Sequence, residues 1–128
     1  MIRIQKLSKT FDRTPVLTDL NMTIQTGSIY GLIGVNGAGK TTLIKHMSGM
    51  LKGDEGSITY DGEPIWENDT LKQCIGLIPD ELYFPNGYSL RDMRSIYSGF
   101  YENWNEDRFH QLAGLFKLDE KAKIRTFS

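Results

Sequence analysis

The segment from Gly34 to Thr41 combines residue types and spacing that suit phosphate chemistry. It reads "GVNGAGKT" and fits the pattern G-x-x-x-x-G-K-[ST]. Because glycine has no side chain, successive backbone N–H groups of such a loop can turn toward an anion, and the lysine adds a positive charge beside it. The pattern therefore predicts a loop that wraps the phosphates of a nucleotide, the alternative being an ordinary glycine turn.

The polar side chains of this loop have separate predicted roles. Lys40 reaches the β- and γ-phosphates, the hydroxyl of Thr41 ligates Mg²⁺, which prefers oxygen ligands, and Thr42 adds a hydrogen bond to phosphate. The residues predicted to bind the nucleotide here are Gly34, Asn36, Gly37, Ala38, Gly39, Lys40, Thr41 and Thr42.

The flanking sequence predicts the elements that position this loop. Residues 28–34, "SIYGLIG", form a nearly continuous apolar run, which is typical of a strand buried on both faces. The segment that follows the loop places apolar residues at helical spacing, namely Leu43, Ile44, Met47 and Leu51. The order strand, glycine loop, helix is the context in which this motif binds phosphate.

Further strands are predicted around this unit. Residues 2–11 and 16–25 alternate apolar and polar residues and are separated by the turn sequence "DRTP". Residues 53–65 predict a hairpin that turns at Asp61-Gly62, and residues 74–80, "CIGLIPD", predict a second buried strand.

The last third of the sequence predicts helices. Ser89 and Asp92 form a capping-box pattern, and the apolar residues after it recur at intervals of three and four. A second helix is predicted to begin near Asn105. We therefore divide the chain into residues 1–88, a β-subdomain with the phosphate-loop core, and residues 89–128, the start of a helical subdomain.

Composition narrows the possible partners. Lys and Arg total 15 against 16 Asp and Glu, so a net charge of -1 disfavours binding to nucleic acid or to an anionic membrane. A single cysteine, Cys74, excludes an internal disulfide, and no apolar run is long enough for a signal peptide or a membrane span. These features favour a cytoplasmic location.

The stretch "LIGVNGAGKTTLIKHMSGMLKGDEGSITYDG" resembles the ATP-binding subunits of ABC transporters, and the resemblance extends over the whole chain. It implies an α/β P-loop nucleotide-binding fold with an antiparallel β-subdomain, an incomplete parallel core and a helical subdomain. Phe11 stands where the family stacks an aromatic side chain on adenine, and Val16 is placed at the ring edge. The alternatives are a core aromatic at Phe11 and simple packing at Val16.

Asp80 departs from the family pattern. The resemblance implies a glutamine at this position, which holds Mg²⁺ and the attacking water. A carboxylate can also ligate Mg²⁺, so Asp80 joins Thr41 as a predicted metal ligand and Lys40 as a predicted catalytic residue. The alternative is a turn cap at Asp80. Some export-type members carry an acidic residue here, which favours export.

The resemblance also implies a function and partners. The implied function is the hydrolysis of ATP with Mg²⁺, which drives transport. The implied partners are a transmembrane permease subunit and a second ATP-binding subunit, with which a dimer forms when ATP binds. The location implied is cytoplasmic, peripheral on the inner face of the cell membrane. The loop after Asp80, with exposed-looking Leu82, Tyr83, Phe84 and Tyr88, is the expected docking surface for the permease.

Some family features have no counterpart here. Only Phe127 and Ser128 match the opening of the signature L-S-G-G-Q, a strand ending Asp-Glu is missing, and neither His46 nor His110 matches the switch histidine. We therefore expect the chain to be truncated before the signature motif. We also expect residues 1–128 alone to be inactive in ATP hydrolysis.

The sequence lacks features that two other classes of nucleotide-binding protein require. A small GTPase would require the guanine-reading motif N-K-x-D, which is absent, and a small-molecule kinase would not begin with an antiparallel β-layer. A soluble ABC-type ATPase of DNA repair or the ribosome, and a nucleotide-binding segment without catalysis, stay open as alternatives.

Overall fold

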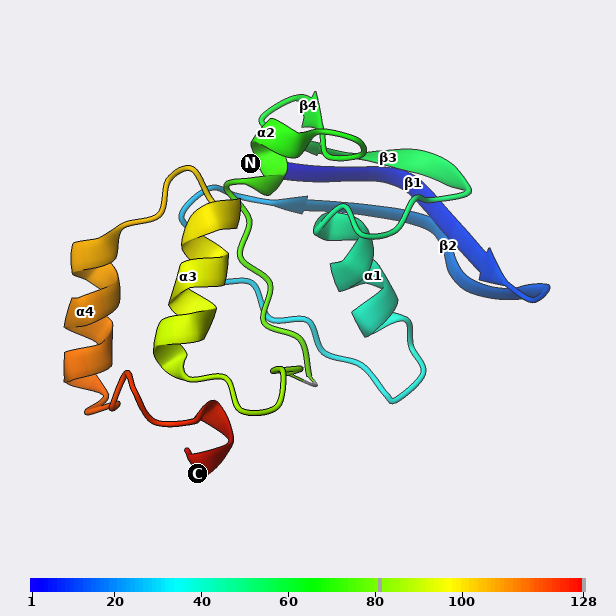
Figure 1. The fold of residues 1–128 in the computed structure, drawn as a ribbon. Coiled ribbons are helices and arrows are strands. Elements are labelled where there is room, and N and C mark those ends of the chain that lie inside the picture. Colours follow the sequence, from blue (N-terminus) through cyan, green and yellow to red (C-terminus); the bar gives the residue numbers. More distant parts are fainter. Residues whose placement is uncertain (81, 128) are drawn as a thin grey trace. The chain divides into compact units, whose positions relative to one another are not determined.

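Four antiparallel strands form the framework of the N-terminal unit, Met1–Ile75, in the computed structural model, which describes residues 1–80 and 82–127. They are β1 (Ile2–Phe11), β2 (Thr14–Ile24), β3 (Glu55–Tyr60) and β4 (Glu63–Pro64), in the spatial order β2-β1-β3-β4 (Figure 1). The predictions of an N-terminal pair of strands and of a hairpin turning at Asp61-Gly62 are confirmed.

The core of this unit lies between the sheet and the helix that follows the glycine loop. That helix, α1, spans Lys40–Met47 and contributes Leu43 to the core. The buried apolar side chains are Ile4, Leu7, Leu17, Leu43, Ile58 and Ile65. A short helix, α2 (Asp69–Lys72), follows β4, and its first turn is capped by the side chain of Asn68. Burial of these side chains is the main force that holds α1 against the sheet.

The β1–β2 hairpin extends beyond the rest of the sheet. The pairing of β1 with β3 ends at Ser8 and Glu55, whereas its pairing with β2 continues to Phe11 and Thr14. The turn residues Asp12 and Arg13 have φ angles of 46° and 67°, as a two-residue hairpin turn of the primed type requires. The tip of this hairpin therefore has one neighbouring strand instead of two.

Two predicted strands are not formed. Residues 28–34 and 74–80 have no regular secondary structure, so the strand predictions for "SIYGLIG" and "CIGLIPD" are wrong for this structure. Ile29, Ile33 and Ile78 are almost fully exposed. A buried strand requires partners for its backbone and cover for both faces, and no strand of the described residues runs beside either segment.

The second unit begins at Gly76 and is helical. It contains α3 (Leu90–Phe100), α4 (Glu106–Leu115) and a 3₁₀ turn at Ile124–Thr126. The predicted capping box is present, since Ser89 and Asp92 each accept a hydrogen bond from the backbone N–H of the other. Within residues 1–80 and 82–127, no helix is long and apolar enough to span a membrane.

A polar cluster connects α3 with α4. Arg94 forms an ion pair with Glu106, whose second carboxylate oxygen accepts the indole N–H of Trp104 at 2.7 Å. This hydrogen bond, together with the charge of Arg94, lowers the pKa of the Glu106 carboxyl. His110 is exposed, and its Nδ1 lies 2.7 Å from the carboxylate of Glu120. The two units divide after Ile75, earlier than the boundary at residue 88 expected from the sequence.

Candidate nucleotide-binding site

The glycine loop ends directly in the first turn of α1. Gly37 and Gly39 have φ angles of 84° and 83°, a left-handed conformation that favours glycine. Among the described residues, no side chain caps the N-terminus of α1, and its first turn contains no acidic residue. Backbone N–H groups and the positive end of the helix dipole are therefore available to an anion.

Lys40 lies across this loop. Its ammonium group donates hydrogen bonds to the carbonyl oxygens of Gly34, at 2.6 Å, and of Val35, at 2.8 Å. A β-carbon added at Gly34 would lie 3.4 Å from Cβ of Ala38 and 3.8 Å from Cδ of Lys40. These are ordinary van der Waals distances, so Gly34 lies directly against Ala38 and Lys40. A glycine loop with an ammonium group beside it fits a phosphate group.

The loop packs closely on β2. A β-carbon at Gly39 would lie 2.9 Å from the carbonyl oxygen of Val16 and 3.1 Å from Cδ2 of Leu17. Only glycine allows this approach, because a contact under 3.0 Å with a backbone atom requires the backbone to shift. The sequence predicted that Val16 and the glycine loop belong to the same nucleotide site, and in the structure Val16 lies against Gly39 of the loop.

Phe11 lies at the tip of the β1–β2 hairpin and is 41% exposed. Phe11 is therefore not among the core residues that the structure describes. The ammonium group of Lys9 lies 5.4 Å from the centroid of the Phe11 ring. An exposed aromatic ring on a strand end suits a base that presents a flat apolar face, and stacking on adenine stays a prediction.

The other predicted site residues differ in exposure and in hydrogen bonding. Thr41 is exposed and Thr42 is half-buried, and the carbonyl oxygen of Thr42 lies 2.7 Å from Nδ1 of His46. Asn36 and Ala38 are exposed, and the N–H of Ala38 donates to the carbonyl of Val35 at 3.2 Å. Thr41 therefore has a hydroxyl open to a ligand.

Asp80 is exposed in a bend of the second unit, so its role as catalytic residue and metal ligand stays a prediction. In the part of the chain that the structure describes, no group of three or more His, Cys, Asp and Glu side chains could hold a metal ion. Within the first unit, the hydroxyl of Thr41 is the oxygen that the motif assigns to Mg²⁺, and it fits that hard cation.

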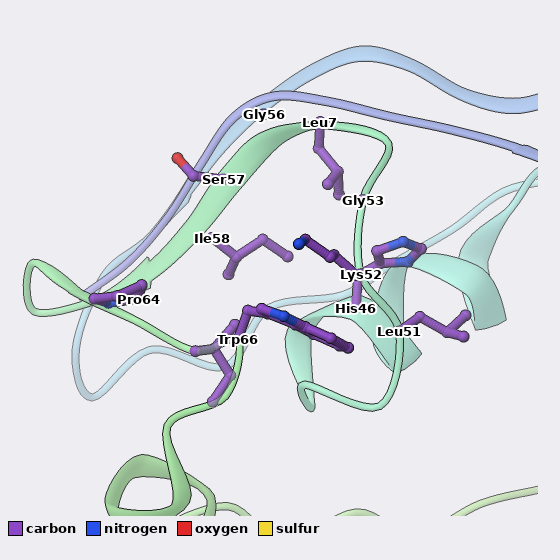
Figure 2. Close-up of a pocket in the computed structure, with 11 residues that line it drawn as sticks. Leu7, His46, Leu51, Lys52, Gly53, Gly56, Ser57, Ile58, Pro64 and Trp66 are labelled. Carbon is purple, nitrogen blue, oxygen red and sulfur yellow. The ribbon is translucent and has the colours of Figure 1, made fainter.

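A separate hollow of about 120 Å³ lies in the same unit and shares no lining residue with the glycine loop. Figure 2 shows the side chains around it, among them His46, Lys52 and Trp66. His46 is 2% exposed, and its Nε2 has no hydrogen-bond partner among the described residues. His46 is thus a packing residue. The ammonium group of Lys52 lies 5.7 Å from the Trp66 ring.

Sequence reasoning missed two residues close to Phe11. Lys9 and Asp54 form an ion pair with a distance of 2.7 Å between the ammonium nitrogen and a carboxylate oxygen. No motif marks either residue, because they are far apart in the sequence and stand among many charged residues.

Comparison with known proteins agrees with this geometry. The family model described as ABC transporter matches residues 17–128. The chain is 32% identical, over its whole length, to the ABC transporter ATP-binding protein YtrB of Bacillus subtilis, and spans 44% of that protein. It is 31% identical to the SkfA peptide export ATP-binding protein SkfE of the same species, with 97% of the chain matched and 58% of SkfE.

Solved structures give the same result. An ABC transporter ATP-binding protein from Pyrococcus furiosus superposes with a TM-score of 0.80 and 33% identity, covering 99% of this chain and 62% of the other. The α/β P-loop fold expected from the sequence is thereby confirmed. The names of other relatives refer to import as well as export. The chain spans about half the length of these relatives. It belongs to the ABC transporter family and matches the ATP-binding subunits of that family.

Proposed function

We propose that the whole protein binds ATP together with Mg²⁺ and hydrolyses it to drive the export of a substrate through a transmembrane permease subunit. The observation that carries this proposal is the loop of Gly34 to Lys40, which packs closely on β2 at Gly39 and has the ammonium group of Lys40 beside it. The family membership supports transport, and the name of SkfE, which refers to peptide export, supports its direction. A second ATP-binding subunit and a location on the inner face of the membrane belong to the same proposal.

The residues of this chain have distinct parts in the proposed reaction. Lys40 exchanges its two carbonyl partners for phosphate oxygens, and the backbone N–H groups at the start of α1 bind the same phosphates. Mg²⁺, when bound at Thr41, neutralises charge on the phosphates. Asp80 is proposed to ligate Mg²⁺ and to act as a catalytic residue.

We also propose that residues 1–128 alone bind nucleotide without sustained turnover. Hydrolysis requires groups that position water and metal, and the described residues contain no cluster of metal-ligating side chains. The exposed Ile29 and Ile33 beside the loop further weaken the support of the phosphate site.

Substitution of Phe11 tests its proposed contact with the base. In Phe11→Ala, ATP affinity should fall by about 1 to 3 kcal/mol, because base–aromatic stacking is lost, whereas Phe11→Trp should retain affinity. Isothermal titration with ATP measures this, and thermal melting shows whether the variant is folded. ATP binding by Phe11→Ala at wild-type strength would contradict the assignment.

Substitution of Tyr83 tests the proposed docking surface. Tyr83 is 85% exposed, whereas Phe84 is half-buried, so Tyr83 is the better residue to change. A charge is costly at an apolar interface, so Tyr83→Glu should reduce co-purification with the permease about tenfold or more while the ATPase activity of the free subunit stays unchanged.

Leu115→Glu is the matched control, since Leu115 is a 72% exposed apolar residue on α4. It should leave permease binding intact. Equal loss of binding in both variants, or loss of basal ATPase activity in Tyr83→Glu, would argue against a specific docking surface at Tyr83 and against the transport assignment that it supports.

A further inference from the structure

The tip of the β1–β2 hairpin needs an anchor that the sheet does not provide. Past the pair formed by Ser8 and Glu55, β1 is hydrogen-bonded to β2 alone, and its register with β2 shifts on both sides of Lys9. A two-stranded ribbon twists and bends more readily than a strand with neighbours on both sides. The orientation of Phe11 therefore depends on contacts from outside the hairpin.

Asp54 supplies these contacts. One carboxylate oxygen accepts a hydrogen bond from the ammonium group of Lys9 at 2.7 Å, and the other accepts the backbone N–H of Thr10 at 2.8 Å. The backbone N–H of Asp54 donates to the carbonyl of Ser8 at 2.9 Å. One residue thus binds three consecutive positions of β1 directly before Phe11. The hydrogen bond from Lys9, followed by that from Thr10, lowers the pKa of the Asp54 carboxyl, which is therefore ionised at neutral pH.

The position of Asp54 is itself determined by a close backbone approach. Gly53 lies in the connection from α1 to β3, near Leu7 of β1 (Figure 2). A β-carbon at Gly53 would lie 2.7 Å from Cδ1 of Leu7 and 2.9 Å from the carbonyl oxygen of Glu55. Because this connection also leads back to α1, Asp54 ties the hairpin tip to the helix that carries the phosphate loop.

Lys9 completes the arrangement. Its side chain is only 18% exposed, and its ammonium group lies 5.4 Å from the centroid of Phe11, within the range of a cation–π contact. An ammonium group above one face of the ring leaves the opposite face for a ligand. Since Asp54 holds Lys9, the two residues together restrict how the ring is turned.

From these contacts we propose that Lys9 and Asp54 are positioning residues for nucleotide binding, which hold Phe11 so that one face is covered by Lys9 and the other receives the base. This inference rests on the proposed function, in which Phe11 stacks on adenine. It adds that Phe11 and Lys9, which together form the base platform, are aligned with the phosphate loop through Asp54.

The test compares two ligands on the whole protein. ATP contacts both the base platform and the phosphate loop, whereas inorganic tripolyphosphate contacts only the loop, and both are titrated in the presence of Mg²⁺. Lys9→Met should weaken ATP binding about two- to fivefold, the size of an exposed cation–π contact, and leave tripolyphosphate binding unchanged. Asp54→Asn should act in the same direction, and Lys9→Arg should restore affinity for ATP.

Two further variants make the result specific. In a Phe11→Ala background, Lys9→Met should cause no additional loss of ATP affinity, because the platform is already absent. Lys52→Met is the matched control, since it removes a lysine from another aromatic ring, that of Trp66 (Figure 2), and should change neither affinity.

Other results would overturn either the positioning inference alone or the stacking proposal as well. If Phe11→Ala selectively weakens ATP binding but Lys9→Met and Asp54→Asn do not, the positioning inference is overturned and the stacking proposal stands. Equal weakening of both ligands by Lys9→Met would show a general structural role and also overturn it. If Phe11→Ala itself does not distinguish ATP from tripolyphosphate, the stacking proposal fails and the inference fails with it.

Discussion

Lys40→Ala is expected to lower ATP turnover of the whole protein by at least 10²- to 10³-fold and to weaken ATP binding. In the structure the ammonium group of Lys40 already lies at the loop, bound to the carbonyl oxygens of Gly34 and Val35. Its removal takes away the positive charge that is proposed to bind the phosphate oxygens, so the negative charge of the phosphates is less well compensated. Phosphate release and nucleotide titration measure the two effects.

Lys45→Ala is the control for this prediction. Lys45 lies on the same helix, α1, and is exposed, so its removal changes the net charge by the same amount without touching the loop. It should leave both turnover and affinity close to wild type. Wild-type turnover in Lys40→Ala would contradict the assignment of the loop as the phosphate site, whatever the control shows.

Gly39→Ala should disrupt the site through the backbone. A residue with a β-carbon costs about 1–2 kcal/mol in the left-handed conformation, and Gly39 has a φ of 83°. The new β-carbon would also lie 2.9 Å from the backbone oxygen of Val16, and such overpacking typically costs a further 1–3 kcal/mol. We expect a destabilisation of about 2–5 kcal/mol from the two costs together, measured by urea unfolding, and loss of detectable ATP binding.

Gly27→Ala separates these two costs. Gly27 has a φ of 75°, but a β-carbon there would meet no heavy atom within 4 Å. This variant should therefore show only the conformational cost, about 1–2 kcal/mol, and retain ATP binding. Equal destabilisation in Gly27→Ala and Gly39→Ala would mean that the close packing of the loop on β2 does not contribute to stability.

Local signals in the sequence predicted a large part of the fold. The alternation in residues 2–11, the turn at Asp61-Gly62 and the caps at Ser89 and Asn105 each depend on residues close together in the chain. Hydrogen bonds of turns and caps form between neighbours, so their residue types are sufficient to identify them. The glycine loop belongs to the same class, because its spacing alone specifies where the helix begins and where the lysine lies.

The two predicted strands that are not formed show where local signals are insufficient. The apolar runs of residues 28–34 and 74–80 have the composition of buried strands, but a strand exists only where another strand accepts its hydrogen bonds. That partner cannot be read from the run itself. The sequence by itself therefore determined the conformation of the glycine loop, the hairpins and the helix starts, whose contacts are between near neighbours.

Only the tertiary structure decided how the loop meets its surroundings. The approach of Gly39 to Val16 and the bonds of Asp54 to Lys9 and Thr10 join segments that are distant in the chain. Contacts of this kind arise when the sheet and α1 pack around a common core, and a charged residue such as Asp54 carries no mark of its eventual partner. The pairing of β1 with β3, which ends at Ser8 and Glu55, brings Asp54 beside the residues that precede Phe11.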